Sequence, residues 1–344
     1  MSVSKTEART LHGADCERHK QNGDIIGLIA TSKSFIRVIV NSAGKPKALI
    51  VNSKGKTMTK YPKLFSTDSA KAAKASGYGY LNAIHYLAPY TLGGAGNLCP
   101  NASAACVALC LGHYSGQAAM VSDLENGTNN VRESRKLKAQ LFMRDRAEYM
   151  NRLARDIIKL DAQATRESLE LCVRLNGSSD IVWERISFEI DAKTAKALYL
   201  PEYAGRIFTL PQLFPAIQFV EYTKLPGRLG KAPRNLDLTL SYSAENAQDC
   251  VDALMAGHNV AMVFAGGLPE SFAGFFVIDG DKHDLRHLDQ KGGYIVGLSP
   301  KGAKAKKDTS GFVVRWLEQS GKDLSEYMQF LREAPYRLPK RSKA

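Results

Sequence analysis

Residues 217–243 read IQFVEYTKLPGRLGKAPRNLDLTLSYS. The stretch contains two short apolar runs, 217–224 and 236–243, which have the length and composition of β-strands. Further runs of this kind end at Asp180, Phe264, Asp281 and Gly302. Several of the intervals between the runs have room for a helix. Because strands that alternate with helical segments are typical of parallel β/α units, we expect an α/β fold with a partial or full β/α barrel over residues 81–310.

The two ends of the chain differ from this pattern. Residues 1–80 hold short β-rich pieces around two turn signals and several lysines, which predicts a small, basic β-rich region. Between 131 and 158 apolar residues recur every three or four positions, which predicts a long amphipathic helix or a broken pair of helices. Residues 311–344 are expected to form a C-terminal helix with a basic tail.

Composition narrows the class of protein. The 344 residues are 44% hydrophobic and 24% charged, which is ordinary for a soluble globular chain. We find no run of eighteen apolar residues and no secretory signal, so we expect a cytosolic protein without a membrane partner. A formal net charge of +13 favours polyanionic partners, and nucleic acid is the expected one.

Three of the six cysteines, Cys99, Cys106 and Cys110, lie in the Gly- and Ala-rich stretch GNLCPNASAACVALCLGHYSG, residues 96–116. Three thiolates from one loop can hold three irons of a four-iron four-sulfur cluster and leave the fourth iron open. With His113 as a fourth ligand they fit a structural zinc site instead. A third interpretation has no metal: the thiols are buried in an Ala-rich helix, where Cys106 and Cys110 share a face.

Polar clusters follow four of the expected strands. In parallel α/β folds ligands bind beyond the carboxyl ends of the strands, so these clusters are candidates for one shared pocket, although such residues also simply make turns. The clusters are Asn176, Ser178, Ser179 and Asp180; Glu221, Tyr222, Thr223 and Lys224; Ser241, Tyr242 and Ser243; and Asp279, Asp281, Asp284 and Arg286. Near the last cluster, His283 and His287 would form a metal pair if their segment were helical.

The order of these motifs resembles a group of bacteriophage proteins known as the gene product 88 family. The resemblance covers residues 81–302 and rests on CPNASAAC, on a helix with Arg132 and Arg135, and on FMRDRAEYMNRLARDI, VRLNGSSDIVWE, FVEYTK, LTLSYS, NVAMVF and VIDGDKHDLR. It implies a phage origin, hence the host cytoplasm, and a barrel-like α/β fold. It also implies a cysteine site similar to that of radical S-adenosylmethionine enzymes.

This resemblance assigns expected roles to the candidate residues. Cys99, Cys106 and Cys110 would hold a four-iron four-sulfur cluster, with zinc as the alternative metal. Residues expected to bind the cofactor, S-adenosylmethionine, are Asn176, Ser178, Ser179, Asp180, Tyr222 and Ser241. The catalytic candidates are Asp180, Glu221, Lys224, Asp279, Asp281 and Arg286.

Three functions remain open at this point. The first is an iron–sulfur enzyme that acts on nucleic acid or a nucleotide-derived substrate, for example in DNA base modification. The second is a base-exchanging transglycosylase that uses Asp180 or Asp279 as nucleophile or base and carries structural zinc. The third is a basic nucleic-acid-binding or host-interaction protein without catalytic activity.

Overall fold

The structure, a computed structural model, describes residues 25–31, 34–40, 46–52, 57–58, 62–68 and 70–315. The chain divides into two units, Met1–Pro62 and Lys63–Ala344. The first unit contains an antiparallel sheet of four strands in chain order, which confirms the small N-terminal β region. Its strands are β1 (Ile25–Thr31), β2 (Ser34–Val40), β3 (Pro46–Asn52) and β4 (Thr57–Met58).

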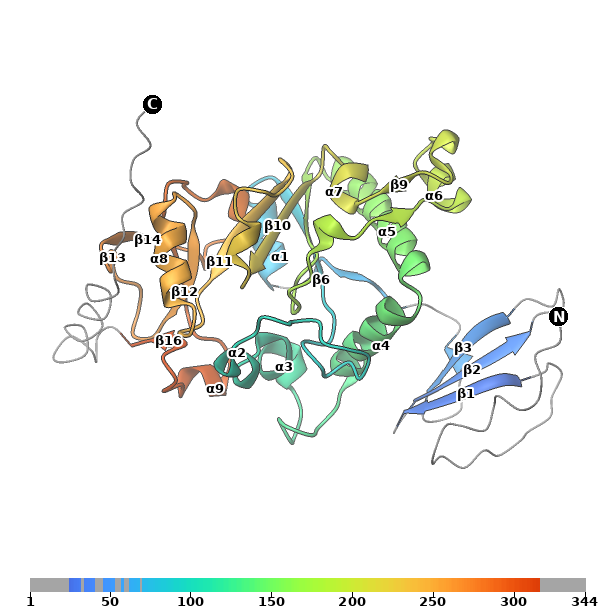
Figure 1. The fold of residues 1–344 in the computed structure, drawn as a ribbon, viewed down its shortest axis with the longest axis horizontal. Coiled ribbons are helices and arrows are strands. Elements are labelled where there is room, and N and C mark those ends of the chain that lie inside the picture. The colour runs from blue at the N-terminus through green and yellow to red at the C-terminus, as the bar shows by residue number, and fades with distance from the viewer. Residues whose placement is uncertain are drawn as a thin grey trace. The chain divides into compact units, whose positions relative to one another are not determined.

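The second unit is built on a ten-stranded, mostly parallel sheet (Figure 1). Its spatial order is β13-β14-β15-β12-β11-β10-β7-β6-β5, and β16 pairs with β12. The strands are β5 (Phe65–Ser66), β6 (Tyr80–His85), β7 (Glu170–Arg174), β10 (Gln218–Thr223), β11 (Leu236–Ser241), β12 (Val260–Phe264), β13 (Ser271–Phe272), β14 (Phe275–Asp279), β15 (Ile295–Leu298) and β16 (Val313–Val314). Only the pairs β5·β6 and β13·β14 are antiparallel within it. A separate antiparallel pair joins β8 (Phe188–Glu189) to β9 (Ile207–Phe208).

Nine α-helices are described. They are α1 (Ala70–Ser76), α2 (Ala104–Ala108), α3 (Leu111–Tyr114), α4 (Asn130–Arg144), α5 (Arg146–Arg166), α6 (Ala192–Ala197), α7 (Leu210–Leu213), α8 (Ala247–Met255) and α9 (Ala303–Lys306). Short 3-10 turns connect them: η2 (Gly116–Ala119), η3 (Trp183–Arg185), η4 (Pro201–Tyr203), η5 (Pro226–Arg228) and η6 (Arg286–Leu288).

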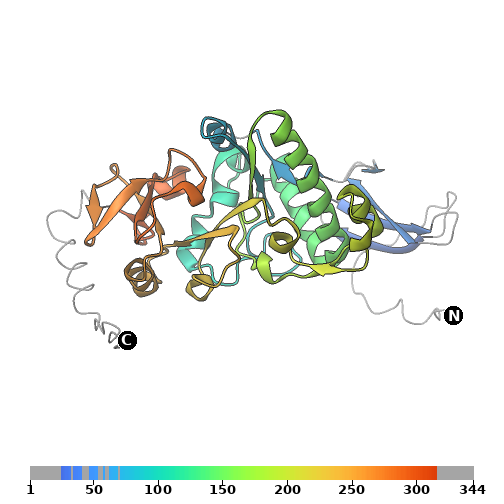
Figure 2. The same ribbon diagram turned by 90° about the horizontal axis from the view of Figure 1, so that it is seen from above.

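The broken pair of helices expected after residue 131 is confirmed as α4 and α5. Asp145 separates them: its backbone leaves the helical region, and its side chain accepts a hydrogen bond from the Glu148 N–H at the start of α5. Apolar residues on α5 that include Leu153 and Ile157 are fully buried. The helix runs beside β6 and β7 (Figures 1 and 2).

From β6 to β12 the strand order follows the chain order. Right-handed crossovers between consecutive neighbours place the connecting helices on the same face of a sheet. The register agrees, because Val173 pairs with Phe219 and Leu240 pairs with Val260, so all four side chains share one face. We call this the outer face.

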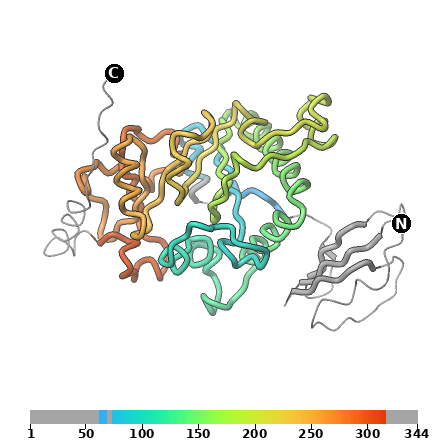
Figure 3. The backbone as a smooth tube through the Cα atoms, viewed as in Figure 1, coloured from blue at the N-terminus to red at the C-terminus, as the bar shows by residue number. Residues whose placement is uncertain are grey.

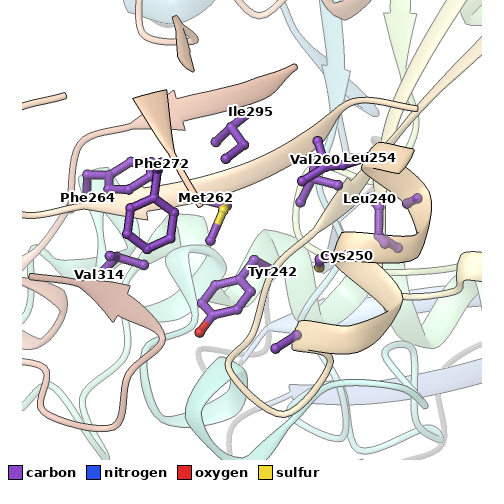
Figure 4. Close-up of a cluster of buried hydrophobic side chains, with 12 residues drawn as sticks. Leu240, Tyr242, Cys250, Leu254, Val260, Met262, Phe264, Phe272, Ile295 and Val314 are labelled. Carbon is purple, nitrogen blue, oxygen red and sulfur yellow. The ribbon is translucent and has the colours of Figure 1, made fainter. Parts of the chain in front are cut away.

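The outer face carries the apolar core. Under α8, the buried side chains of Leu240, Val260 and Ile295 lie in one row, and Met262 and Phe264 continue it along β12 (Figure 4). At the other end of the sheet, His85 of β6 bonds to the Tyr149 hydroxyl of α5 at 2.7 Å.

The opposite face, here called the inner face, is mixed: Cys172 and Val220 pack with Ala75 of α1 and Leu285, but many of its side chains are polar. It carries Asn82, Arg174, Tyr222, Asp237 and Thr239, which alternate with the outer-face residues along their strands. Helix α1 and the segment 280–291 between β14 and β15 lie against it. Contacts that hold this segment include Lys74 Nζ to the Asp281 carbonyl at 2.8 Å, and the rings of Tyr80 and His287 at 4.8 Å.

The fold is therefore a mixed α/β structure with a mostly parallel central sheet. Within the described strands the sheet ends at β5 and β13, and closure into a barrel stays a prediction. The expected C-terminal helix and basic tail fall almost entirely on 316–344, outside the described residues. None of the described helices combines the length and apolar character needed to cross a bilayer.

Candidate functional site

The three clustered cysteines lie on the connection between β6 and α4, called here the cysteine loop (residues 86–129). Cys99 precedes α2, Cys106 lies in α2, and Cys110 is the residue before α3. Helix α2 is only five residues long and ends at Ala108, so the continuous Ala-rich helix considered from the sequence does not form. Cys106 and Cys110 consequently share no helical face.

The three thiols lie within electrostatic range of one another. Burial, together with the charges of Cys106 and Cys99, raises the pKa of Cys110 to about 12. Burial also raises the pKa of Cys99 to about 11, again with Cys106 as a neighbour. All three side chains are partly exposed and reduced. As the described side chains stand, no three His, Cys, Asp or Glu residues form a group that could hold a metal ion.

Two arginines of α4 fix the course of the cysteine loop. The buried Arg132 guanidinium donates to four backbone carbonyls of the loop, those of His113, Ala118, Leu124 and Gly127. Arg135 donates to the Gly112 carbonyl and lies over the Tyr86 ring. In the sequence, these arginines served only as part of the resemblance to the family. Their contacts with the loop could not be predicted, because helical periodicity does not show which charged residues become buried.

His113, the expected fourth zinc ligand, has different neighbours. Burial lowers the pKa of its ring, and the nearby charges that act on it are those of Arg132, Glu125 and Lys304. The ring packs edge-on against Tyr114. The Nε2 atom of the ring is buried and has no hydrogen-bond partner among the described residues, so zinc ligation by His113 stays a prediction.

The loop after β7 lies directly against the cysteine loop. The Cys99 thiol lies 3.7 Å from the Ser178 carbonyl, and the Ser178 hydroxyl donates to the Leu87 carbonyl at 2.6 Å. Gly177 permits this approach, because a Cβ there would lie 2.5 Å from the His85 carbonyl oxygen. Ser178 is thus a predicted cofactor residue that the structure brings to the thiols.

Asn176, also predicted to bind the cofactor, organises this loop. Its side-chain oxygen accepts from the Ser179 hydroxyl at 2.8 Å, the Ile181 N–H at 3.0 Å and the Trp183 indole at 2.9 Å. Its amide nitrogen donates to the Ile181 carbonyl. Asn176 and Ser179 therefore shape the loop, and these bonds occupy the polar atoms that a cofactor would need.

Asp180 joins this loop to the end of β10. One carboxylate oxygen accepts from the Thr223 hydroxyl and the other from the Lys224 N–H, both at 2.9 Å. Arg228 lies 3.5 Å from the same carboxylate and is itself held by both oxygens of Glu184. Sequence patterns did not single out Arg228 or Glu184, because a charged pair in a loop gives no sign that it will be buried.

Glu221 and Tyr222 point to opposite faces of the sheet. Glu221 lies on the outer face, where one oxygen accepts from the Leu175 and Asn176 N–H groups, and burial raises its pKa to about 8. Tyr222 lies on the inner face under the Arg174 guanidinium, 4.6 Å from the ring centroid. Of the two, only Tyr222 faces the polar side where a substrate would lie.

Lys224 lies at the carboxyl edge of the inner face. Its ammonium donates to the Ser241 hydroxyl at 2.7 Å, the Ser241 carbonyl at 2.9 Å and the Tyr242 carbonyl at 3.0 Å. Burial lowers the pKa of Lys224, and the nearest opposing influence is the Cys106 thiol. Lys224 and Ser241 thus lie beside the thiols, as the strand-end clusters predict.

The last strand-end cluster is divided. Asp279 is exposed and Asp281 pairs with Lys301 at 2.7 Å. Asp284 and Arg286 lie against the inner face, where Asp284 is 3.6 Å from Arg174 and Arg286 pairs with Asp289 at 3.1 Å. His283 and His287 pack on Tyr78 and Tyr80, and of the two only His287 lies in the three-residue turn η6, so the helical His pair does not form.

Two cavities bear on the location of the site. One of about 510 Å³ lies at the amino ends of the strands, between residues such as Tyr80, Glu170 and Asn235. A second of about 190 Å³ adjoins the cysteine loop at Gly112 and Arg135. The larger cavity lies away from the thiols, and ligands of parallel α/β sheets bind at the carboxyl ends, so we place the candidate site at the carboxyl edge.

The fold and the site together define an α/β protein wound in chain order, with a cysteine loop at the carboxyl edge of its sheet. Residues 62–315 match the family described as Gene product 88, and the chain belongs to that family. Comparison with curated proteins and with solved structures gives no match.

Proposed function

We propose that the chain is a phage metalloenzyme of the radical S-adenosylmethionine type, in which Cys99, Cys106 and Cys110 hold an iron–sulfur cluster. The observation that carries the proposal is that three partly exposed thiols lie on one loop at the carboxyl edge of a parallel sheet, beside the polar side chains of the inner face. We further propose nucleic acid, or a molecule derived from a nucleotide, as the substrate.

The donor set fits this cofactor better than a structural zinc. Three thiolates satisfy three irons of a four-iron cluster and leave one iron open, whereas tetrahedral zinc needs a fourth protein ligand. The groups whose charges act on His113 are Arg132, Glu125 and Lys304, and no thiol is among them. When bound, such a cluster supplies one-electron reducing chemistry, and binding requires the three thiols to lose their protons and draw closer together.

The surrounding residues support and shape the proposed site. Arg132 and Arg135 hold the loop that carries the thiols. Asp180 ties the β7 loop to β10, and Lys224 places a positive charge next to Cys106. The Ser178 loop and the inner-face side chain of Tyr222 are the groups best placed to contact S-adenosylmethionine or substrate.

The transglycosylase alternative needs a carboxylate free to act as nucleophile or base. Asp180 uses both of its oxygens in hydrogen bonds within the protein, and one oxygen of Asp279 accepts from the Asp281 N–H. These contacts favour the iron–sulfur proposal. A purely binding protein, the third alternative, has no need for three partly exposed thiols next to a buried lysine.

Anaerobic reconstitution tests the proposal. The purified chain is incubated with iron, sulfide and reductant, desalted, and analysed for iron, acid-labile sulfide, zinc and visible absorbance. We expect about four irons per chain and a broad charge-transfer band. The triple variant Cys99→Ala, Cys106→Ala, Cys110→Ala should lose both.

Cys250→Ala is the matched control, because Cys250 is a buried thiol of α8 outside the cysteine loop. It should retain iron and colour. A colourless protein that binds one zinc, or equal iron in the triple variant, would overturn the proposal. Thermal unfolding of each apo-variant separates loss of the cluster from loss of the fold.

A further inference from the structure

The connection between β15 and β16, residues 299–312, concentrates positive charge next to the cysteine loop. It contains four lysines within seven residues, Lys301, Lys304, Lys306 and Lys307. In Figure 3 this segment, with α9, lies beside the part of the chain that carries α2 and α3. We call it the lysine segment.

Contacts between side chains fix this position. Gly302 approaches the Tyr114 carbonyl so closely that a Cβ would lie 2.5 Å from that oxygen. The Lys304 ammonium lies 3.6 Å from the centre of the Tyr114 ring and pairs with Glu125. The lysine segment is thus attached to α3, which directly follows Cys110.

The lysine segment is also rigidly anchored to its own strands. Asp281 accepts hydrogen bonds from the Ser299 N–H at 2.8 Å and from Lys301 at 2.7 Å. Asp308 accepts from the Ser310 and Val313 N–H groups at 3.0 and 2.9 Å. Because the backbone is held in this way, the segment presents its remaining side chains in a fixed arrangement.

Two of the four lysines have ammonium groups available to bind a partner. Lys301 and Lys304 are paired with Asp281 and Glu125. Lys306 and Lys307 are exposed, and neither forms an ion pair with any described residue. Adjacent exposed ammonium groups attract consecutive phosphates, because each contact releases a condensed counterion.

An aromatic ring completes the surface. Phe312, at the end of the same segment, is partly exposed, and its ring centre lies 5.3 Å from the Lys224 ammonium. Lys224 in turn neighbours Cys106. The ring therefore belongs to the same segment as the exposed lysines and lies next to a lysine that neighbours one of the thiols. Aromatic rings next to positive charge are the usual platform for unpaired bases.

We propose that the lysine segment binds single-stranded nucleic acid, with phosphates on Lys306 and Lys307 and a base stacked on Phe312. This inference deepens the proposed function, because it places a strand at the edge where the thiols lie. An acidic protein partner would pair with the lysines but has no base to stack on the ring. The presence of Phe312 therefore favours nucleic acid as the partner. Binding by this surface requires no metal.

Fluorescence anisotropy with a labelled oligothymidylate tests the inference. The double variant Lys306→Glu, Lys307→Glu should bind on the order of tenfold more weakly at low salt. The slope of log affinity against log salt should fall by about 1.4, at about 0.7 for each lost phosphate contact on a single strand. Lys193→Glu, Lys196→Glu on α6 changes the net charge by the same amount and is the matched control.

Phe312→Ala should weaken binding roughly five- to 100-fold with little change in the salt slope, because stacking is not ionic. Phe276→Ala, at an exposed ring on β14, should have no effect. Equal losses in the two charge variants, an unchanged affinity in Phe312→Ala, or tighter binding to a duplex of the same length would each overturn the inference.

The same titration on the triple cysteine variant separates this inference from the proposed function. If the variant loses iron but keeps its affinity for the oligonucleotide, the surface is independent of the metal. If the wild-type chain binds iron but not the oligonucleotide, the strand-binding inference fails and the metal proposal stands. Iron content of the Lys306→Glu, Lys307→Glu variant should equal that of wild type.

Discussion

The two faces of the parallel sheet differ in how many polar side chains they bury. On the outer face, Leu240, Val260 and Ile295 pack under α8 and need no polar partner. On the inner face, within the described residues, several buried polar atoms lack a hydrogen-bond partner, including both amide atoms of Asn82 and the Tyr222 hydroxyl. Buried polar groups are normally paired, since leaving one unpaired costs about 1–3 kcal/mol. The outer face therefore stabilises the fold through apolar packing, with the unpaired Oε2 atom of Glu221 as an exception, whereas several polar groups of the inner face are buried at a cost in stability.

The largest effect should come from the outer face. Phe264→Ala removes a ring that is 1% exposed and leaves a cavity in the core, so the free energy of unfolding should fall by about 3–5 kcal/mol in urea denaturation. Phe276→Ala removes a ring that is 68% exposed and should change it by about 0.5 kcal/mol or less. If both variants lost a similar amount of unfolding free energy, the outer-face core would not be the main source of stability.

The cysteine loop extends the comparison, because polar bonds rather than apolar packing hold it. Arg132→Met leaves four backbone carbonyls without their donor and should lower the free energy of unfolding by about 2–4 kcal/mol. Hydrogen exchange should show faster exchange between 113 and 127. Arg152→Met, which breaks a surface pair with Glu148, should cost about 0.5 kcal/mol or less. A loop that exchanges as in wild type would refute the anchoring role.

Sequence patterns predicted the framework of the fold but not its closure. Apolar runs such as 217–224 and 236–243 gave correct strands, because strand burial leaves a local signature in composition. The sequence left open whether residues 131–158 form one long helix or two. Asp145, which caps α5, separates the two helices, and a single residue of this kind leaves little trace in the apolar pattern. The short helix α2 was missed because Ala-rich composition favours a longer helix, and the hydrogen bonds and packing around Cys110 override it.

Glu221 allows a sharper test of polar burial, because pH controls the effect. Burial raises its pKa from 4.5 to about 8 in the folded state. As pH rises from about 4.5 to 8, the unfolded chain loses this proton while the folded chain keeps it, so the contribution of Glu221 to stability falls across that window. At pH 8, Glu221→Gln should be more stable than wild type by on the order of 1–3 kcal/mol.

The control for that experiment is Glu189→Gln, at an exposed position on β8. The difference between Glu221→Gln and wild type should vanish near pH 4, where both states of the wild-type chain are protonated. A difference that stays constant from pH 4 to pH 8 would contradict the proton linkage and point to packing instead.

The smallest effect on stability should come from the inner face. The Tyr222 hydroxyl has no hydrogen-bond partner among the described residues, so Tyr222→Phe should not lower the free energy of unfolding and should raise it by about 1 kcal/mol. If this hydroxyl contacts cofactor or substrate, the same variant should weaken binding of S-adenosylmethionine, measured by calorimetry on the reconstituted chain. A large loss of stability would mean that the hydroxyl serves the fold.

The site was less predictable than the fold, and the reason is physical. The strand-end pattern correctly placed Ser178, Lys224 and Ser241 at one edge, because parallel strands share their carboxyl ends. It did not distinguish polar groups that bind the protein itself, such as Asn176, from groups that are free to bind a ligand. That distinction depends on contacts between distant segments, which no local pattern records.

The winding of the sheet in chain order also bears on how the protein is made. Each strand of the central sheet from β6 to β12 pairs with the strand of that sheet synthesised before it, so the sheet can grow as the chain leaves the ribosome. The three cysteines emerge early, just after β6, whereas the segment 280–291 and the lysine segment emerge later. The loop that carries the thiols is therefore synthesised before the segment that covers the inner face.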